Sequence, residues 1–346
     1  MKVIIFSGAG LSAPSGLPTY EELKLDDRYS DFFSSSSEAA FDIISDFVGQ
    51  FSHAKPNKAH RECLNIEQFC RVFGIKFEHF TLNIDSLVES TGGAVTHLHG
   101  CVDDLNNLVE NRFKTFDPFE QMIWEPGDIL LVLGVSNDGY PLAFLEQMVT
   151  QSGASFRNYN MFPNDVLIGP QVVGDITQTL SAIDALNLLD LKCLFEIFPF
   201  DGYEADIVKF FMYGREYVVY FSPTLDFYTS PDEVDAVEAY IKHKLTKKSS
   251  EIKFDLTVNS ERIGESFTAP QDKFTLKQLN MFGTVLVTII GAHAKFREPD
   301  LYTASAIRPE LVPFYNRLAL RCAARLEYSH WCAFGKDGVT YAFKKQ

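Results

Sequence analysis

The first half of the chain alternates between short apolar runs and segments whose apolar residues recur at helical spacing. Residues 2–7 and 129–133 are almost wholly apolar and run into glycine, which is typical of strands buried on both faces. Further strands are expected at 76–82, 94–98 and 156–161, and helices at 37–51, 57–73, 117–124, 141–151 and 174–186. The pattern predicts an α/β fold with a Rossmann-like parallel sheet covered by helices on both faces.

After Leu186 the pattern of apolar and aromatic residues changes. Strand-like aromatic segments occupy 216–221 and 252–258, and a β-branched run occupies 284–290. Between them, Ser230-Pro231-Asp232-Glu233 has the form of a helix-capping box with proline at the first helical position. Because 346 residues exceed what a single core usually holds, we expect two domains, 1–188 and an α+β domain at 189–346.

Charge is distributed unequally between the two halves. Residues 1–190 contain 11 basic and 26 acidic side chains, whereas residues 191–346 contain 20 of each, so the net charge of −15 lies on the first half. Such a surface repels nucleic acid and anionic lipid, and neither is expected as a partner. For the aromatic-rich second domain, a protein partner or self-association remains open.

The apolar segments of the chain indicate where in the cell the protein resides. The start of the chain has only four consecutive apolar residues, Val3 to Phe6, too few for the core of a secretory signal. No run approaches the ~20 apolar residues of a membrane-spanning helix. We therefore expect a cytoplasmic protein with no membrane partner.

A glycine-rich stretch follows the first expected strand. Gly8-Ala9-Gly10 has the strand–turn–helix context in which glycines let a backbone approach a pyrophosphate and helix amides supply donors. With so few cations nearby, backbone amides are expected to do most of the phosphate binding. The longer stretch from Gly8 to Tyr20 resembles the opening signature of the sirtuin family. A lone Gly-x-Gly is weak evidence, so the later segments decide.

Further segments resemble sirtuin motifs and occur in the family's order. They are Pro56-Asn57-Lys58-Ala59-His60, Thr81-Leu82-Asn83-Ile84-Asp85-Ser86-Leu87, His97-Leu98-His99-Gly100, Gly134-Val135-Ser136, Asn160 and Gly174-Asp175. The resemblance covers about half of the chain and does not extend to residues 191–346. It implies a sirtuin-type domain that takes NAD as a substrate and cleaves its nicotinamide–ribose bond.

Three residues are the expected catalytic groups. Nicotinamide leaves NAD as a neutral base, so positive charge develops on the ribose, and the site must orient that ribose and supply a base. Asn83 can hold ribose hydroxyls or an attacking water, and Asp85 can accept from the nicotinamide carboxamide and favour the developing charge. His99 titrates near neutrality and, by its resemblance to the sirtuin histidine, is the expected base.

The resemblance also implies a set of NAD-binding residues. These are Gly8, Ala9, Gly10, Ser12, Pro18, Tyr20, Gly134, Ser136 and Asn160. Ser12 and Ser15 have an equally good explanation as turn and helix-capping residues. His60 and His97 are expected to be structural.

The sequence departs from the family in several places. Family deacylases carry two Cys-x-x-Cys pairs after the His-Gly, but the 33 residues between Gly100 and Gly134 contain only Cys101, so no zinc or other metal is expected. The Phe-Gly-Glu segment that pairs with an acyl-lysine peptide has at best a remnant at 116–120. Glu21 replaces an expected arginine and puts a negative charge near the pyrophosphate.

These losses fall mostly on peptide recognition, and the pattern resembles the sirtuin-related NAD hydrolases of bacterial and phage conflict systems. The leading interpretation is an enzyme that releases nicotinamide and ADP-ribose, with water or another acceptor capturing the ribosyl group. One alternative is an NAD-dependent protein lysine deacylase that uses the second domain in place of the lost module. The other is a non-catalytic sensor of NAD or ADP-ribose.

Overall fold

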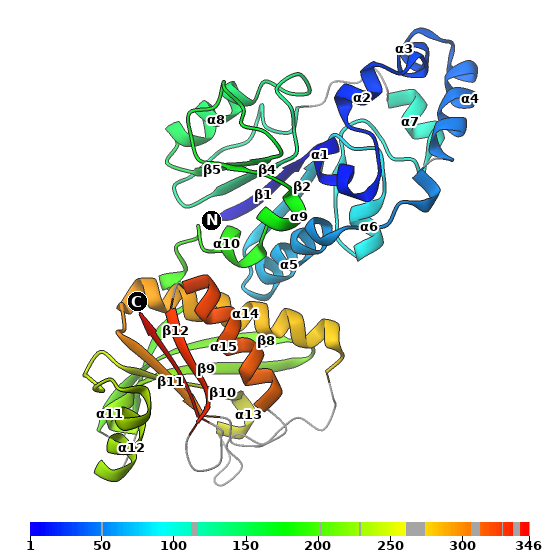
Figure 1. Cartoon of the computed structure of the whole chain (residues 1–346). Helices are drawn as coiled ribbons and strands as arrows, with labels where there is room; N and C mark the ends of the chain where they lie inside the picture. The colour runs from blue at the N-terminus through cyan, green and yellow to red at the C-terminus, as the bar shows by residue number, and fades with distance from the viewer. Residues whose placement is uncertain are drawn as a thin grey trace. The chain divides into compact units, whose positions relative to one another are not determined.

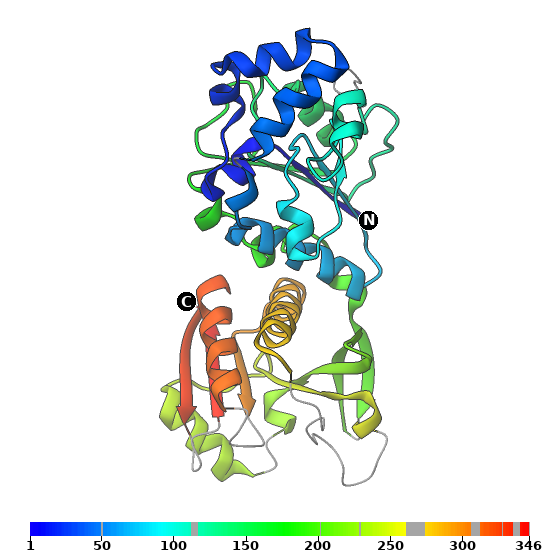
Figure 2. The same cartoon turned by 90° about the vertical axis from the view of Figure 1, so that its right-hand side faces the viewer.

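The computed structural model describes residues 1–49, 51–111, 117–200, 202–227, 230–260, 274–305, 312–326, 328–334 and 340–345 (Figures 1 and 2). The chain divides into two compact units, here called the N-terminal unit, Met1–Leu189, and the C-terminal unit, Asp190–Gln346. The division falls one residue after the boundary expected from the sequence.

The N-terminal unit is built on a six-stranded sheet in the order β3-β2-β1-β4-β5-β6. Every adjacent pair is parallel, which confirms the predicted Rossmann-like sheet. The strands are β1 (Lys2–Ser7), β2 (Lys76–Thr81), β3 (Thr96–His97), β4 (Ile129–Leu133), β5 (Ser155–Asn160) and β6 (Gln171–Val173). The strand order reverses beside β1, and in such sheets ligands bind outside the carboxyl ends of the strands at that point.

Two groups of helices accompany this sheet. Figure 1 shows α8 (Leu142–Gln151) on one face, and α5 (Lys58–Val72), α9 (Ile176–Thr179) and α10 (Ala182–Leu186) on the other. A second group, here called the helical lobe, consists of α2 (Tyr20–Lys24), α3 (Asp27–Ser34), α4 (Ser37–Val48) and α7 (Leu105–Asn111). Short elements complete the unit: α1 (Ala9–Ser12), η1 (Ala13–Ser15), η2 (Phe51–His53) and α6 (Leu87–Thr91).

The helical lobe has a small apolar core of its own. Ala40 and Ile44 of α4 lie four residues apart, on one face of the helix, and pack with Phe32 and Leu108. This spacing explains why α4 forms where a helix was expected, although it ends at Val48 rather than at residue 51.

Two helix predictions in the N-terminal unit are wrong. Residues 118–121 form a turn instead of the helix expected at 117–124, because Phe119 and Trp124 are drawn into the core beside the sheet. The Asp117 carboxylate stabilises this turn by accepting from the Phe119 amide at 2.8 Å. The helix expected at 174–186 is two short helices, since Leu180 between them is extended.

The C-terminal unit contains a seven-stranded mixed sheet in the order β12-β13-β11-β10-β9-β8-β7, which confirms the predicted α+β class. β10 and β11 are parallel, and the other adjacent pairs are antiparallel. The strands are β7 (Glu196–Phe200), β8 (Tyr203–Met212), β9 (Arg215–Pro223), β10 (Ser250–Leu256), β11 (Leu301–Ser305), β12 (Tyr328–Phe334) and β13 (Thr340–Lys345). Its helical segments are η3 (Leu191–Leu194), α11 (Thr224–Phe227), α12 (Pro231–Ile241), α13 (Thr257–Ser260), α14 (Leu276–Arg297) and α15 (Val312–Leu326).

Helices pack on both faces of this sheet, as the alternation of side chains along β11 and β13 shows. Leu301 and Ala342 pack with Val237 and Ile241 of α12. The next residue of β11, Tyr302, faces the opposite way and hydrogen-bonds His293 of α14 at 2.7 Å. The sheet therefore lies between α12 on one face and α14 on the other.

The β-branched run at 284–290 is helical, in contrast to the strand-like segments with which it was grouped. It lies inside α14, which starts at a capping box formed by Thr275 and Gln278. A helix that is apolar on all sides is usually buried. From a short apolar run alone, such a helix cannot be told apart from a buried strand. By length and composition α14 is apolar enough to cross a membrane, which was not expected from the sequence. However, 72% of its most apolar 18-residue stretch is buried inside the protein.

Candidate active site

A cavity of about 1240 Å³ lies where the carboxyl ends of β1, β4 and β5 face the helical lobe. All its lining residues belong to the N-terminal unit. They include every residue that the sequence assigned to catalysis or NAD binding: Gly8, Ala9, Gly10, Ser12, Pro18, Tyr20, Asn83, Asp85, His99, Gly134, Ser136 and Asn160. The volume exceeds the roughly 300–1,000 Å³ of ordinary small-molecule pockets, so the cavity has room for a large ligand.

The floor of the cavity is a direct backbone contact between the glycine loop after β1 and the loop after β4. The Gly8 amide donates to the Leu133 carbonyl at 3.0 Å, and the Gly10 amide donates to the Gly134 carbonyl at 2.9 Å. A Cβ on Gly10 would lie 2.7 Å from the Gly134 Cα, and Gly134 itself has a φ of +63°. Both positions therefore require glycine.

This contact changes the expected role of the loop amides. The amides of Gly8 and Gly10 are already bonded to backbone carbonyls across the loop contact. Within the described part of the chain, no acceptor is seen for the Ala9 amide at the first position of α1. Fewer backbone donors therefore face a bound phosphate than the sequence suggested.

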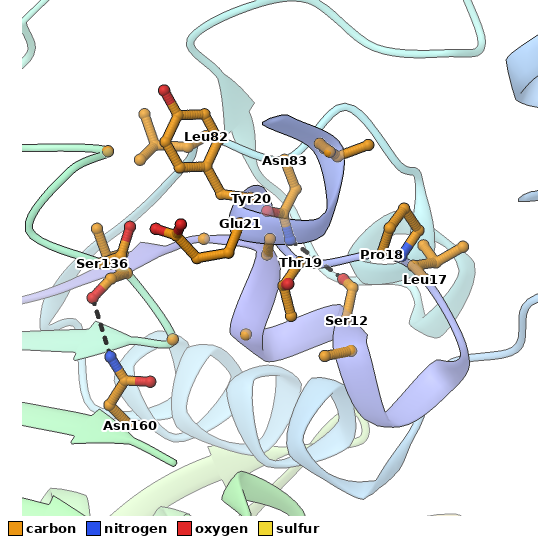
Figure 3. Close-up of a pocket in the computed structure, with 18 of the residues that line it drawn as sticks. Ser12, Leu17, Pro18, Thr19, Tyr20, Glu21, Leu82, Asn83, Ser136 and Asn160 are labelled. Carbon is orange, nitrogen blue, oxygen red and sulfur yellow. Dashed lines mark hydrogen bonds between the residues drawn. The ribbon is translucent and has the colours of Figure 1, made fainter. Parts of the chain in front are cut away.

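Asn83 is held by a polar network that begins at the buried His60. The Nδ1 of His60 accepts from the Asn57 amide, so its Nε2–H is the donor to the Ser12 Oγ at 3.4 Å. Ser12 Oγ also accepts from Asn83 Nδ2 at 3.1 Å (Figure 3). None of the described residues donates to the Asn83 Oδ1, which leaves this oxygen as an acceptor for a ligand.

Burial shifts the pKa of both ionisable catalytic candidates, Asp85 and His99. Asp85 is 8% exposed, and burial raises the pKa of its carboxyl group, with hydrogen bonds from the Leu87 amide and from Ser12 opposing the shift. His99 is half-buried, and burial lowers the pKa of its imidazole. Burial therefore favours the neutral form of the His99 imidazole, and none of the described residues is seen to hydrogen-bond its ring.

Two of the expected NAD-binding polar residues lie at the other end of the cavity. Asn160 is the last residue of β5, and its Nδ2 donates to the Val135 carbonyl at 3.1 Å (Figure 3). Its Oδ1 accepts from the Met161 amide at 2.9 Å. Asn160 therefore stabilises the loop that carries Ser136, and both the nitrogen and the oxygen of its side-chain amide already form hydrogen bonds within the protein.

Ser15, in contrast to Ser12, does not line the cavity. Its Oγ accepts from Asn57 Nδ2 at 3.1 Å, while the same amide donates to the Leu11 carbonyl at 2.8 Å. Of the two serines considered from the sequence, Ser12 is placed at the cavity and Ser15 supports the turn behind it.

One cation of the cavity escaped the sequence analysis. Arg28 of α3 lines the cavity together with Glu21, and its guanidinium pairs with Asp26 at 2.5 Å. No motif marks it, because it lies seven residues after the position at which an arginine was sought. Arg28 thus brings a guanidinium, paired with Asp26, to the same cavity that Glu21 lines.

The apolar half of the cavity was also missed. Its walls come mainly from the helical lobe and the adjoining loops, and consist of Leu17, Leu23, Phe32, Ile43, Ile44, Phe51, Ile84 and Leu108. In the sequence these residues are indistinguishable from ordinary core positions. Their helical spacing could have indicated the lobe, but not that the lobe faces a cavity.

Several known proteins are similar to part of this chain. No family model matches the chain. It is 34% identical over 211 residues to an NAD-dependent protein deacylase of Mycobacterium tuberculosis, covering 47% of this chain and 87% of that protein. It is 32% identical over 117 residues to an NAD-dependent protein deacylase of Campylobacter jejuni, covering 31% of this chain and 48% of that protein. The chain thus spans about half the length of this second relative.

The remaining comparisons are weaker. Identity to the human NAD-dependent protein lipoamidase sirtuin-4, mitochondrial, is 28% over 139 residues, covering 34% of this chain and 43% of that protein. The solved structure of Sir2Tm bound to a propionylated peptide is 22% identical, covers 51% of this chain and 89% of its own, and has a TM-score of 0.35. The extensive match to the mycobacterial protein is decisive, and over about half its length the chain belongs to the sirtuin family.

Proposed function

We propose that this protein is an NAD-dependent enzyme that cleaves the bond between nicotinamide and ribose. One observation supports this most strongly: a single cavity at the strand-order reversal is lined by the glycine loop, Asn83 and His99. The loops after β1 and β4 bring bare backbone to the cavity, which is the kind of surface a pyrophosphate approaches. The volume of about 1240 Å³ suits a dinucleotide.

The proposed roles follow from the hydrogen bonds. Nicotinamide departs with the electron pair of the broken bond, and the ribose carbon gains a bond to the oxygen of an acceptor. Asn83, anchored through Nδ2 to Ser12, would present Oδ1 to a ribose hydroxyl or to the acceptor water. His99, kept neutral by burial, would take the proton released by that oxygen. Asp85 would favour positive charge on the ribose.

Water is the acceptor that the sequence favours. The family's four-cysteine zinc module does not fit this chain, because the 33 residues between Gly100 and Gly134 supply only Cys101. The remnant of the peptide-pairing segment at 116–120 begins at Phe116, outside the described residues, and its residues 118–120 lie in a turn. Loss of both features weakens peptide recognition and leaves NAD hydrolysis as the first proposal.

An acyl-lysine acceptor is the second candidate, and the comparisons favour it over hydrolysis. The mycobacterial and Campylobacter relatives are both named NAD-dependent protein deacylases. The apolar half of the cavity, with Phe32, Ile44 and Leu108 among its walls, offers a place for an acyl chain beside the nicotinamide end. Deacylation would have the acyl oxygen attack the ribose in place of water.

One experiment distinguishes these readings. The full-length protein is incubated with NAD, with and without an acetyl-lysine peptide, and nicotinamide and peptide are followed by chromatography. Nicotinamide release without peptide supports hydrolysis, and release only in step with peptide consumption supports deacylation. Asn83→Ala should abolish either activity, whereas Asn65→Ala, on α5 and away from the cavity, should not. NAD binding without any turnover would reject the enzyme proposal in favour of a sensor.

A further inference from the structure

Three side chains of metal-binding type gather beside the cavity without lining it. Glu89 belongs to α6, His97 to β3, and Cys101 follows the His-Gly segment. Their ligand atoms, a carboxylate oxygen, an imidazole nitrogen and a thiol sulfur, all lie within 4.8 Å of one another. They are spread over three segments of the chain, so only the fold brings them together.

The orientation of His97 is fixed by a backbone acceptor. Its Nδ1 lies 2.7 Å from the Asn83 carbonyl oxygen, which can only accept, so Nδ1 carries the hydrogen. The other nitrogen, Nε2, then faces Glu89 Oε1 at 2.7 Å and the sulfur of Cys101. In the neutral ring Nε2 has a lone pair, and a metal cation could then lie between Nε2, the Glu89 carboxylate and the Cys101 sulfur. With Nε2 protonated instead, His97 and Glu89 form an ion pair.

This arrangement matches the surroundings of metal-binding histidines. Such residues usually donate their second ring N–H to a carbonyl or carboxylate, which fixes the ring and raises its basicity. We propose that Glu89, His97 and Cys101 bind a divalent zinc-like cation through Oε1, Nε2 and Sγ, with water as the fourth ligand. A set of one thiolate, one imidazole and one carboxylate suits zinc and is poor for magnesium or calcium.

The site needs only a small adjustment to accept the ion. Tetrahedral zinc with nitrogen and oxygen ligands separates them by about 3.3 Å, so Glu89 Oε1 and His97 Nε2 must part slightly from 2.7 Å. The Glu89 side chain is 37% exposed and can move, whereas His97 is 10% exposed and fixed. These ligands are not those of the family's four-cysteine module, and the sequence search for cysteine pairs could not detect them.

The position of this metal site gives it a structural role. His97 holds the backbone carbonyl of Asn83, and the segment from His97 to Cys101 contains His99. A cation on His97 and Cys101 would clamp both ends of that segment. It would therefore position the two cavity residues without touching the substrate.

Metal content of the full-length protein tests the proposal independently of any NAD chemistry. The protein is purified without chelator, supplied with Zn²⁺, desalted, and analysed by elemental mass spectrometry. We expect about one zinc per chain and its loss in Cys101→Ser. Cys193→Ser changes an exposed cysteine of the C-terminal unit and should leave the content unchanged.

Cobalt gives a second measurement that does not depend on protein yield. Co²⁺ bound through Cys101 should produce a thiolate-to-metal charge-transfer band, which disappears in Cys101→Ser and weakens in Glu89→Gln. Circular dichroism of each variant establishes that it is folded. The proposal is overturned if the wild-type protein binds no zinc and shows no cobalt band, because His97 and Glu89 are then simply an ion pair, or if Cys101→Ser retains both signals.

Discussion

The side-chain amide of Asn83 donates to the hydroxyl of Ser12 at 3.1 Å, so a residue of the glycine-rich segment orients the central asparagine of the cavity. Ser12 in turn receives a hydrogen bond from His60 on α5. The orientation of the Asn83 side chain therefore depends on three segments of the N-terminal unit and needs no ligand.

Removing the Ser12 hydroxyl should impair catalysis more than folding. In Ser12→Ala the Asn83 amide loses its acceptor, worth about 1–2 kcal/mol, and the rate of NAD cleavage should fall about tenfold. Steady-state kinetics of nicotinamide release measure the effect. Ser15→Ala is the matched control, since Ser15 bonds Asn57 outside the cavity and should leave kcat nearly unchanged. Equal losses in the two variants would contradict the assigned role of Ser12.

The loop contact predicts a large stability difference between two glycines. In Gly134→Ala the new Cβ would lie 2.5 Å from the Gly10 backbone and would occupy a φ of +63°, so the free energy of unfolding should fall by about 2–3 kcal/mol. Gly139→Ala has its nearest neighbour at 3.5 Å and should be nearly neutral. Thermal unfolding followed by circular dichroism makes the comparison, and an unchanged midpoint for Gly134→Ala would argue against the contact.

The pKa of His99 predicts the pH dependence of NAD cleavage. Burial lowers this pKa below its usual 6.5, so the basic form predominates at neutral pH. The rate should be flat near neutrality and should fall as acid protonates the ring. A profile of kcat/KM against pH shows this limb. His99→Gln should lose about 10²- to 10⁴-fold in rate.

Asp85 provides the control for that assignment. Its pKa is raised by burial, so it also contributes to acid loss of activity. Asp85→Asn should remove its contribution and leave the His99 limb in place. A profile with no acid limb in the wild-type protein would exclude His99 as the base.

His60 makes the N-terminal unit sensitive to acid. Burial first, and Arg61 second, lower the pKa of His60 to about 4, whereas in the unfolded chain it is near 6.5. The unfolded state therefore binds the proton more readily, and stability is lost as pH falls from 6.5 toward 4. His60→Gln should lose less thermal stability than the wild type between about pH 7 and pH 5. An identical pH dependence in both proteins would contradict this.

Charge near the expected pyrophosphate site should limit affinity for NAD. Glu21 lines the cavity and its side chain is exposed, so replacing it with glutamine removes a repulsion worth at most about 1 kcal/mol, and the KM for NAD should fall by up to about fivefold. Glu22→Gln, one residue later and outside the cavity lining, should change KM little. A rise in KM for Glu21→Gln would mean that the carboxylate contacts the ligand favourably.

The sequence predicted the sheet well because buried parallel strands such as 2–7 and 129–133 are nearly continuous apolar runs. It also identified residues that meet at one cavity, because glycine-rich and Asn/His segments follow strand ends and parallel strands end at the same edge. The helix predicted at 117–124 is wrong, because a buried aromatic such as Phe119 in a turn resembles the buried position of a helix. The run at 284–290 resembles a strand because a helix that is buried on all sides has no helical periodicity in its apolar residues.

Other features were beyond prediction for a different reason. Arg28, the apolar half of the cavity and the grouping of Glu89 with Cys101 all depend on how separate segments pack. Such contacts between segments leave no local pattern in a single sequence. They become visible only when the fold brings the segments together.

The contact between Gly10 and Gly134 has one more consequence. The two backbones touch there with no side chain between them. A larger residue at one position therefore cannot be accommodated by a smaller residue at the other. These two positions are therefore restricted to glycine, and the backbone between β1 and α1 keeps its shape, whereas the side chains of the helical lobe are under no such restriction. New ligand preferences in this protein should arise by altering the lobe.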